Sequence, residues 1–148
     1  MKFIHCADIH LDSKMETNLS SQKAKERKKE ILNTFENMIY FAQENNVTAI
    51  IIAGDLFDTA RITNLTKSRV INIIQKNNNI DFLYLSGNHD ESNFIELIQD
   101  PPPNLKVFKN SWTTFDYNNI NITGAIIDEN NSATIYDTLN LNKDKLNI

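Results

Sequence analysis

The chain has 148 residues, a length typical of a single domain. Hydrophobic residues make up 41% and charged residues 23% of it, which supplies a packed core and argues against a disordered chain. The formal net charge of −4 argues against a protein that coats nucleic acid with a basic surface, because such binding needs many phosphate contacts. An enzyme that acts on nucleic acid with bound metal ions remains possible.

The single cysteine, Cys6, cannot form a disulfide within the chain, which suits a reducing compartment. No apolar run approaches the length of a membrane-spanning helix, and the N-terminus turns polar too soon for a signal peptide. We therefore expect a cytoplasmic protein with no membrane contact.

The first part of the chain alternates strand and helix patterns. Short apolar runs predict strands at residues 3–7, 49–53 and 82–85. Helical periodicity predicts helices over residues 22–45 and 65–76, the first of them preceded by the N-cap candidates Ser20 and Ser21. A β-α-β-α-β order implies parallel strands joined by right-handed crossovers.

The pattern changes after Asp90. We expect a short helix near residues 94–98, three strands at 105–108, 112–116 and 120–127, a weak helix at 133–139 and a further strand from Leu146. Residues 119–121 are expected to separate two of these strands as a hairpin. The sequence thus predicts an α/β fold in one domain, residues 1–148, whose mixed sheet begins parallel and continues antiparallel.

A polar cluster follows each of the three N-terminal strands. The clusters are Asp8-Ile9-His10, Gly54-Asp55-Leu56-Phe57-Asp58 and Gly87-Asn88-His89-Asp90. Parallel strands end at one edge of the sheet, where open α/β sheets bind their ligands. We therefore expect Asp8, His10, Asp55, Asn88 and His89 to converge.

These residue types suit a metal centre. Carboxylate and imidazole ligands favour divalent ions such as Mn²⁺, Fe²⁺ or Zn²⁺. Asp8 and His10 lie two residues apart, so they would share one side of an extended stretch. One carboxylate, that of Asp55, could bridge two ions about 3.5–4 Å apart, a spacing used in phosphoester cleavage.

The three clusters, in this order, resemble the calcineurin-like metallophosphoesterase family. The segments FIHCADIHLDS, AGDLFD and SGNHD are similar, within that family, to the nuclease subunit of bacterial SbcCD repair complexes and to YhaO-like exonucleases. The resemblance covers essentially the whole chain and is most specific over residues 1–90. It implies a sandwich of two sheets flanked by helices.

The resemblance also implies a role for each residue of the clusters. Asp8, His10 and Asp55 correspond to ligands of a first metal, and Asp55 and Asn88 to ligands of a second, with Mn²⁺ expected and Fe²⁺ or Zn²⁺ as alternatives. His89 corresponds to the catalytic histidine. Asp58 and Asp90 would fix the loops and polarise their neighbours.

The implied function is a metal-dependent DNA exonuclease or endonuclease of DNA repair. The implied partners are DNA, a second copy bound through the N-terminal helices, and an SbcC-like ATPase. A phosphatase or a cyclic nucleotide phosphodiesterase is the alternative within enzymes. A truncated, non-catalytic dimerising module is the alternative outside them.

One departure from the family pattern concerns the histidines. The family completes its metal sites with histidines further along, whereas none follows His89 in this sequence. We therefore expect an N-terminal portion of the domain, incomplete at its C-terminus and inactive alone.

Three further features have simpler interpretations. His5 is expected to be a hydrogen-bonded core histidine, and Cys6 a small buried residue. The charged residues 23–29 are expected to form a solvated helix face.

Overall fold

The structure, a computed structural model, describes residues 1–15, 19–58, 62–87, 93–96, 98 and 100–148. It divides into two compact units, Met1–Lys106 and Val107–Ile148. The assignment of residues 1–148 to one domain stays a prediction.

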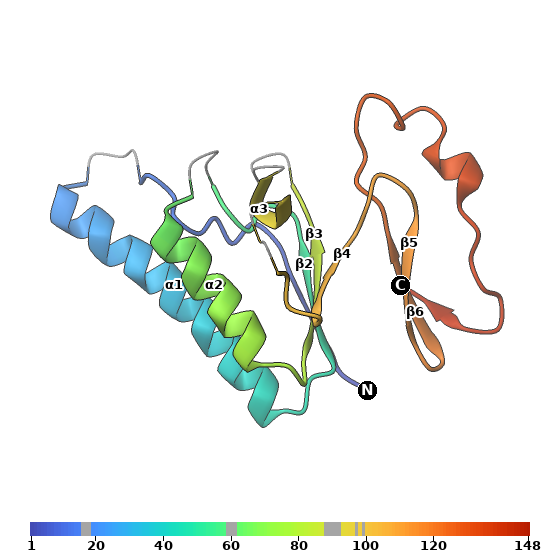
Figure 1. The fold of residues 1–148 in the computed structure, drawn as a ribbon, viewed down its shortest axis with the longest axis horizontal. Coiled ribbons are helices and arrows are strands. Elements are labelled where there is room, and N and C mark those ends of the chain that lie inside the picture. Colours follow the sequence, from blue (N-terminus) through green and yellow to red (C-terminus); the bar gives the residue numbers. More distant parts are fainter. Residues whose placement is uncertain (16–18, 59–61, 88–92, 97, 99) are drawn as a thin grey trace. The chain divides into compact units, whose positions relative to one another are not determined.

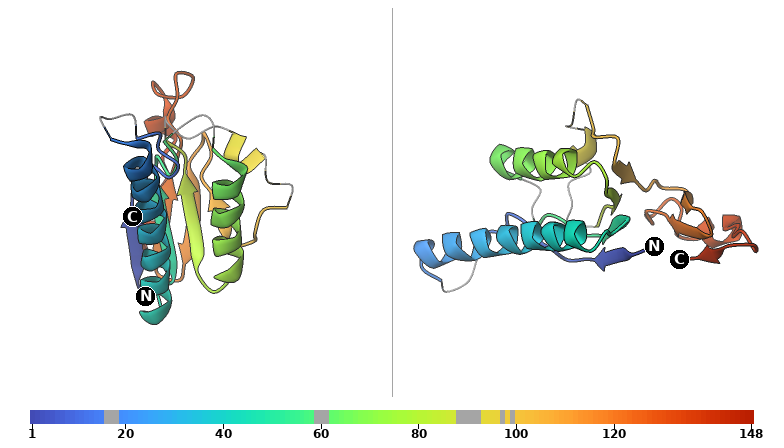
Figure 2. Two further views of the ribbon diagram at one scale, coloured as in Figure 1. Left: turned by 90° about the vertical axis from the view of Figure 1, so that its left-hand side faces the viewer. Right: turned by 90° about the horizontal axis from the view of Figure 1, so that it is seen from below.

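The first unit contains the predicted β-α-β-α-β order. Its sheet has the strand order β1-β2-β3-β4, with β1 paired parallel to β2 and β2 parallel to β3. The helices α1 and α2 lie on one face of this sheet (Figures 1 and 2). The elements of this unit are β1 (Phe3–Cys6), α1 (Ser21–Glu44), β2 (Ala49–Ala53), α2 (Asn64–Lys76), β3 (Asp81–Leu85), α3 (Asn93–Glu96) and β4 (Leu105–Val107).

Both long helices begin at a capped residue. Ser20 accepts a hydrogen bond from the backbone N–H of Lys23 at 3.4 Å, which confirms one of the two predicted N-caps of α1. Thr63 caps α2 in the same way and accepts from the N–H of Thr66 at 3.2 Å. Each cap satisfies a donor that the helix itself leaves unpaired, and its loss typically costs about 1 kcal/mol.

The apolar stripe of α1 divides into two parts. Phe35, Ile39 and Ala42 are buried. Ile31 and Met38 line a cavity of about 500 Å³, together with Cys6, Ile9, Met15, Arg27, Glu30, Thr34 and Phe35. The C-terminal half of α1 therefore carries most of the packing against the sheet.

The core of the first unit is centred on β2 and β3. The run Ala49–Ala53 is mostly buried, as its continuous apolar sequence predicts, and Phe82, Leu83 and Tyr84 of β3 are at most 1% exposed. Asn104 is a buried polar residue of this core, and its amide donates to the carbonyls of Ile74, Asn77 and Ile80 at 2.9–3.0 Å. It therefore fastens the turn between α2 and β3 to the segment that leads into β4.

The prediction for His5 was wrong. His5 is exposed, whereas its neighbour Cys6 is partly buried. Successive side chains of a strand point to opposite faces, and the Cys6 side faces the cavity beside α1. Because β1 is an edge strand of the described sheet, His5 on the other side stays open to solvent.

The second unit contains a three-stranded sheet. β5 (Thr113–Tyr117) and β6 (Ile120–Gly124) form the predicted antiparallel hairpin, and β7 (Leu146–Asn147) pairs with β6 in parallel. The turn lies at Asn118 and Asn119 rather than at residues 119–121, and Asn118 takes the left-handed conformation (φ 57°) that asparagine tolerates.

Two predicted elements of this unit are shorter in the structure. The strand predicted for residues 120–127 ends at Gly124, and the N–H of Ile126 instead donates to the carbonyl of Lys109 at 2.7 Å. The helix predicted for residues 133–139 is a single 3-10 turn, Ile135–Thr138, whose Ile135 carbonyl accepts from the Trp112 indole at 2.7 Å. Among the described residues, no helix is long and apolar enough to cross a membrane.

Candidate metal centre

The loops that follow β1 and β2 continue the pairing of these strands. The N–H of Asp8 donates to the carbonyl of Gly54 at 3.2 Å, and that of His10 to the carbonyl of Asp55 at 3.0 Å. In the other direction, the N–H of Asp58 donates to the carbonyl of Leu11 at 3.2 Å. These backbone bonds hold the two polar clusters side by side before any ligand binds.

Buried apolar side chains anchor the same two loops to the core of the first unit. Leu11, Leu56 and Phe57 are at most 1% exposed, and Leu11 forms a parallel bridge with Phe57. The Phe57 ring packs 4.7 Å from that of Phe94 in α3. The polar residues between these anchors therefore lie on well-packed apolar side chains, which limits their conformational freedom and favours a preorganised site.

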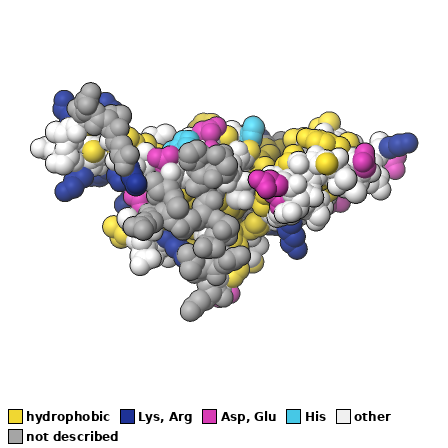
Figure 3. All heavy atoms as spheres, turned by 90° about the horizontal axis from the view of Figure 1, so that it is seen from above, with side chains coloured by type: hydrophobic (Ala, Val, Ile, Leu, Met, Phe, Trp, Pro, Cys, Tyr) yellow, Lys and Arg dark blue, Asp and Glu magenta, His cyan; other side chains and the backbone are white. Residues whose placement is uncertain are grey.

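Three of the predicted ligands meet at this edge of the sheet. Asp8, His10 and Asp55 each offer a ligand atom, and these atoms all lie within 4.8 Å of one another. Asp8 is exposed, His10 is partly buried and Asp55 is the most enclosed of the three. In the view onto this edge of the sheet, acidic and histidine side chains lie close together on the surface (Figure 3).

The backbone reaches this arrangement by a different route from the one predicted. Asp8, His10 and Asp55 have φ values of 53°, 52° and 48°, so the stretch around them is not extended. Left-handed backbone costs most residues about 1–3 kcal/mol, although Asp and His tolerate it better than most. Such conformations concentrate at functional sites, which supports a functional interpretation of this edge.

His10 contacts an acidic side chain on each side of its ring. Its Nδ1 lies 3.0 Å from Oδ1 of Asp58, and its Nε2 lies 3.9 Å from Oδ1 of Asp8. The Asp58 side chain is 27% exposed and that of Asp8 is 74% exposed. Asp58 therefore holds the ring from its more buried side and leaves Nε2 directed at the ligand group.

Gly87 leaves the space that the Asp55 side chain occupies. A Cβ at Gly87 would lie 2.5 Å from the backbone nitrogen of Asp55 and 2.8 Å from its Cγ, and closer still to its Oδ1. Gly54 serves a different purpose, because its φ of 91° lies in the left-handed region that favours glycine and lets the backbone turn sharply. At Gly87 a glycine is needed because any side chain would clash with the Asp55 carboxylate.

The structure tests only part of the predicted site. It brings Asp8, His10 and Asp55 together and sets Asp58 against His10. Asn88, His89 and Asp90 lie outside the described residues. Sequence reasoning gave no role to Asp12, because no local pattern indicates its hydrogen bond with Thr63.

The donor set fits a divalent cation. Two carboxylates and one imidazole are typical ligands of such ions, and Asp8 and Asp55 place two negative charges near each other. A cation between them would offset this repulsion. Asp58 supplies the acidic outer contact that metal-binding histidines usually have.

Three known proteins with similar sequences are named for DNA repair. Over 92 residues, 61% of this chain, the DNA double-strand break repair protein Mre11 of Sulfolobus acidocaldarius is 36% identical, and 22% of that relative is covered. The protein of the same name from Saccharolobus solfataricus is 32% identical over 92 residues, 61% of this chain and 23% of the relative. The one from Methanopyrus kandleri is 29% identical over the same share of this chain and 19% of the relative. The chain therefore matches about a fifth of the length of these curated relatives.

The family comparison covers far more of the chain. The model of the calcineurin-like phosphoesterase family matches residues 1–146. The mixed α/β architecture, with two sheets and flanking helices, agrees with this match. The chain belongs to the calcineurin-like phosphoesterase family.

Proposed function

We propose that this chain carries part of the two-metal phosphodiesterase centre of a DNA repair nuclease. The observation that supports this most is the meeting of ligand atoms from Asp8, His10 and Asp55 within 4.8 Å, at the edge where two parallel strands end. The family match over residues 1–146 gives this cluster its chemical context.

Each site residue has a proposed role. Asp8, His10 and Asp55 hold a first divalent ion, and Asp55 and Asn88 hold a second, with Mn²⁺ as the proposed metal and Fe²⁺ or Zn²⁺ as alternatives. When bound, the ions supply positive charge and Lewis acidity to the scissile phosphate. Asp58 orients the His10 ring, and Asp90 is proposed to support its own loop in a similar way.

His89 is the proposed catalytic residue. The imidazolium form of its side chain would donate a proton to the leaving sugar oxygen as water attacks phosphorus and the phosphoester bond breaks. General acid catalysis of this kind typically contributes about 10²–10⁴-fold to the rate. Removal of His89 should therefore lower turnover and leave the affinity for metal unchanged.

DNA is the proposed substrate. The similarity to three proteins named for DNA double-strand break repair supports this choice over a phosphoprotein or a cyclic nucleotide. A homodimer through the N-terminal helices, an SbcC-like ATPase partner and a cytoplasmic location are further proposals that rest on the resemblance.

The test uses the longest protein that the gene encodes. With Mn²⁺ present, it should degrade end-labelled duplex DNA and leave a cyclic nucleotide and a phosphopeptide intact. Asp55→Ala should abolish the activity, whereas Asp100→Asn, at an exposed carboxylate elsewhere in the first unit, should leave it unchanged. Normal DNA cleavage by the Asp55→Ala variant would contradict the mechanism, and hydrolysis of only the other two substrates would contradict the substrate.

A further inference from the structure

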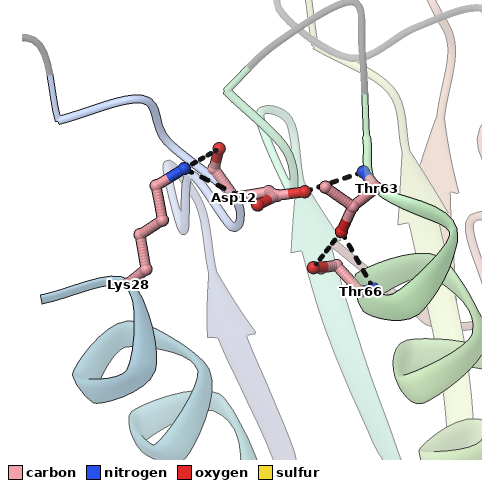
Figure 4. A network of polar contacts seen from close by, with 4 residues as sticks. All are labelled: Asp12, Lys28, Thr63 and Thr66. Atoms are coloured by element: carbon pink, nitrogen blue, oxygen red, sulfur yellow. Dashed lines mark hydrogen bonds and ion pairs between the residues drawn. The ribbon is translucent and has the colours of Figure 1, made fainter. Parts of the chain in front are cut away.

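Asp12 links three segments of the first unit. Its Oδ2 accepts a hydrogen bond from the backbone N–H of Thr63 at 2.7 Å, and its Oδ1 lies 3.8 Å from Nζ of Lys28 (Figure 4). Nζ of Lys28 also lies 3.5 Å from the Asp12 carbonyl oxygen. The Asp12 side chain is only 11% exposed, so it is enclosed by these partners.

The contact with Thr63 joins Asp12 to the start of α2. Thr63 is the N-cap of this helix, and its Oγ1 accepts from the N–H of Thr66 and lies 2.9 Å from the Thr66 hydroxyl oxygen. A carboxylate is favoured at a helix N-terminus, and a hydrogen bond to a charged acceptor is stronger than a neutral one. The bond from Thr63 to Asp12 is therefore stronger than an ordinary loop contact.

The contact between Asp12 and Thr63 joins the C-terminal ends of the two loops that carry the metal-site residues, the loop after β1 and the loop after β2. The N-terminal parts of these loops are already held by backbone bonds from His10 to Asp55 and from Asp58 to Leu11. Asp12 follows Leu11 directly, and Thr63 lies five residues after Asp58. The loop pair is thus tied on both sides of the contact between His10 and Asp58.

We propose that Asp12 is a positioning residue of the metal centre. Its carboxylate fixes the loop after β1 against the start of α2, and so holds His10 in register with Asp55 and Asp58. The part of this inference that concerns metal affinity rests on the proposed function. The part that concerns loop order does not.

A simple helix cap is the competing explanation, and the chain offers a matched control for it. Thr63→Ala removes the Oγ1 cap of α2 but keeps the backbone N–H that Asp12 binds. Asp12→Ala removes the bond to that N–H and keeps the Oγ1 cap. Asp12→Asn keeps an oxygen acceptor for the N–H and loses the charge that faces Lys28 and that strengthens the bond from Thr63.

The experiment measures two properties of the wild-type protein and the three variants. Backbone amide exchange at His10 and Asp58 is followed by NMR without metal. The affinity for Mn²⁺ is measured from the spin resonance signal of the free ion. Asp12→Ala should speed exchange at both amides about tenfold and weaken Mn²⁺ binding about tenfold, a loss typical of residues that support metal ligands.

The other variants give the contrast. Asp12→Asn keeps the acceptor but not the charge, so both of its losses should be clearly smaller than those of Asp12→Ala. Thr63→Ala should speed exchange only in the first turn of α2 and leave Mn²⁺ affinity unchanged. Equal losses of Mn²⁺ affinity in Thr63→Ala and Asp12→Ala would overturn the proposal, because any loosening of α2 would then suffice.

Failure of the proposed function has a different signature. If the wild-type protein binds no Mn²⁺ while Asp12→Ala still speeds exchange at His10 and Asp58, the positioning role stands and the metal centre fails. If the wild-type protein binds Mn²⁺ and Asp12→Ala changes neither property, the metal centre stands and the positioning role is wrong.

Discussion

Nδ1 of His10 lies 3.0 Å from Oδ1 of Asp58, and this contact joins the loop after β1 to the loop after β2. An acidic partner at one ring nitrogen fixes the orientation of the imidazole and makes the other nitrogen a better metal ligand. Nε2, 3.9 Å from Oδ1 of Asp8, is therefore the nitrogen presented to the ligand group.

Asp58→Asn should weaken the metal centre without removing a ligand. We expect Mn²⁺ affinity to fall about tenfold or more, because the amide holds the His10 ring less strongly than the carboxylate does. Isothermal titration of the purified protein with Mn²⁺ measures this. Asp100→Asn is the control, since Asp100 is an exposed carboxylate of the same unit, and an equal loss in both variants would contradict the role of Asp58.

Gly87→Ala should displace the Asp55 carboxylate. The new Cβ would lie 2.8 Å from Cγ of Asp55 and 2.5 Å from its backbone nitrogen, so the Asp55 loop must shift. We expect Mn²⁺ affinity to fall by at least about tenfold, since a ligand displaced from its productive geometry loses most of its contribution.

Gly124→Ala is a matched control for this variant. A Cβ at Gly124 would lie 2.9 Å from the Phe108 ring in the second unit, so it also forces a local adjustment. It should lower the thermal midpoint and leave Mn²⁺ affinity unchanged. The role of Gly87 would be refuted if the two variants bound Mn²⁺ equally well.

Asn104→Ala should destabilise the first unit. The Asn104 amide donates to the carbonyls of Ile74, Asn77 and Ile80, and its truncation leaves these acceptors without that donor in a buried place. The expected loss is about 2 kcal/mol of unfolding free energy, because each buried hydrogen bond lost typically contributes about 1 kcal/mol. Urea unfolding gives the value, and the exposed Asn72→Ala on α2 should change it by less than about 0.5 kcal/mol.

Cys6 should be slow to alkylate in the folded protein. Burial raises the pKa of its thiol from 9.0 to about 11, so the thiolate is about a hundredfold scarcer at pH 8 than that of an unburied cysteine. We expect iodoacetamide to label the folded protein about a hundredfold more slowly than the urea-unfolded chain, as followed by mass spectrometry. The labelling rate of the folded protein should still be rising between pH 9 and pH 10, and equal rates for both forms would show an accessible thiol.

Strand and helix periodicity predicted most of the first unit. The continuous apolar run Ala49–Ala53 and the cap at Ser20 were sufficient signals, because burial on both faces and helix capping are local properties of the sequence. The second unit was predicted less well. There the end of β6 at Gly124 depends on the bond between Ile126 and Lys109, a tertiary contact without a local signal.

Residue type and strand position predicted which side chains form the site, but not the backbone conformation and contacts that hold them. The sequence indicated that Asp8, His10 and Asp55 would meet, since parallel strands end at one edge. It did not indicate the left-handed backbone at these residues or the reach of Asp12 to Thr63. Both depend on how the two loops pair in space, which residue spacing alone does not encode.

The central claim is that Asp8, His10 and Asp55 hold a divalent metal ion, and a Mn²⁺ titration of the wild-type protein and Asp55→Ala tests it most directly. The free-ion signal in electron spin resonance reports how much Mn²⁺ each protein takes up. We predict that the wild-type protein binds Mn²⁺ and that Asp55→Ala, while still folded by circular dichroism, does not. Absence of binding by the wild-type protein, or equal binding by the folded variant, would contradict the account.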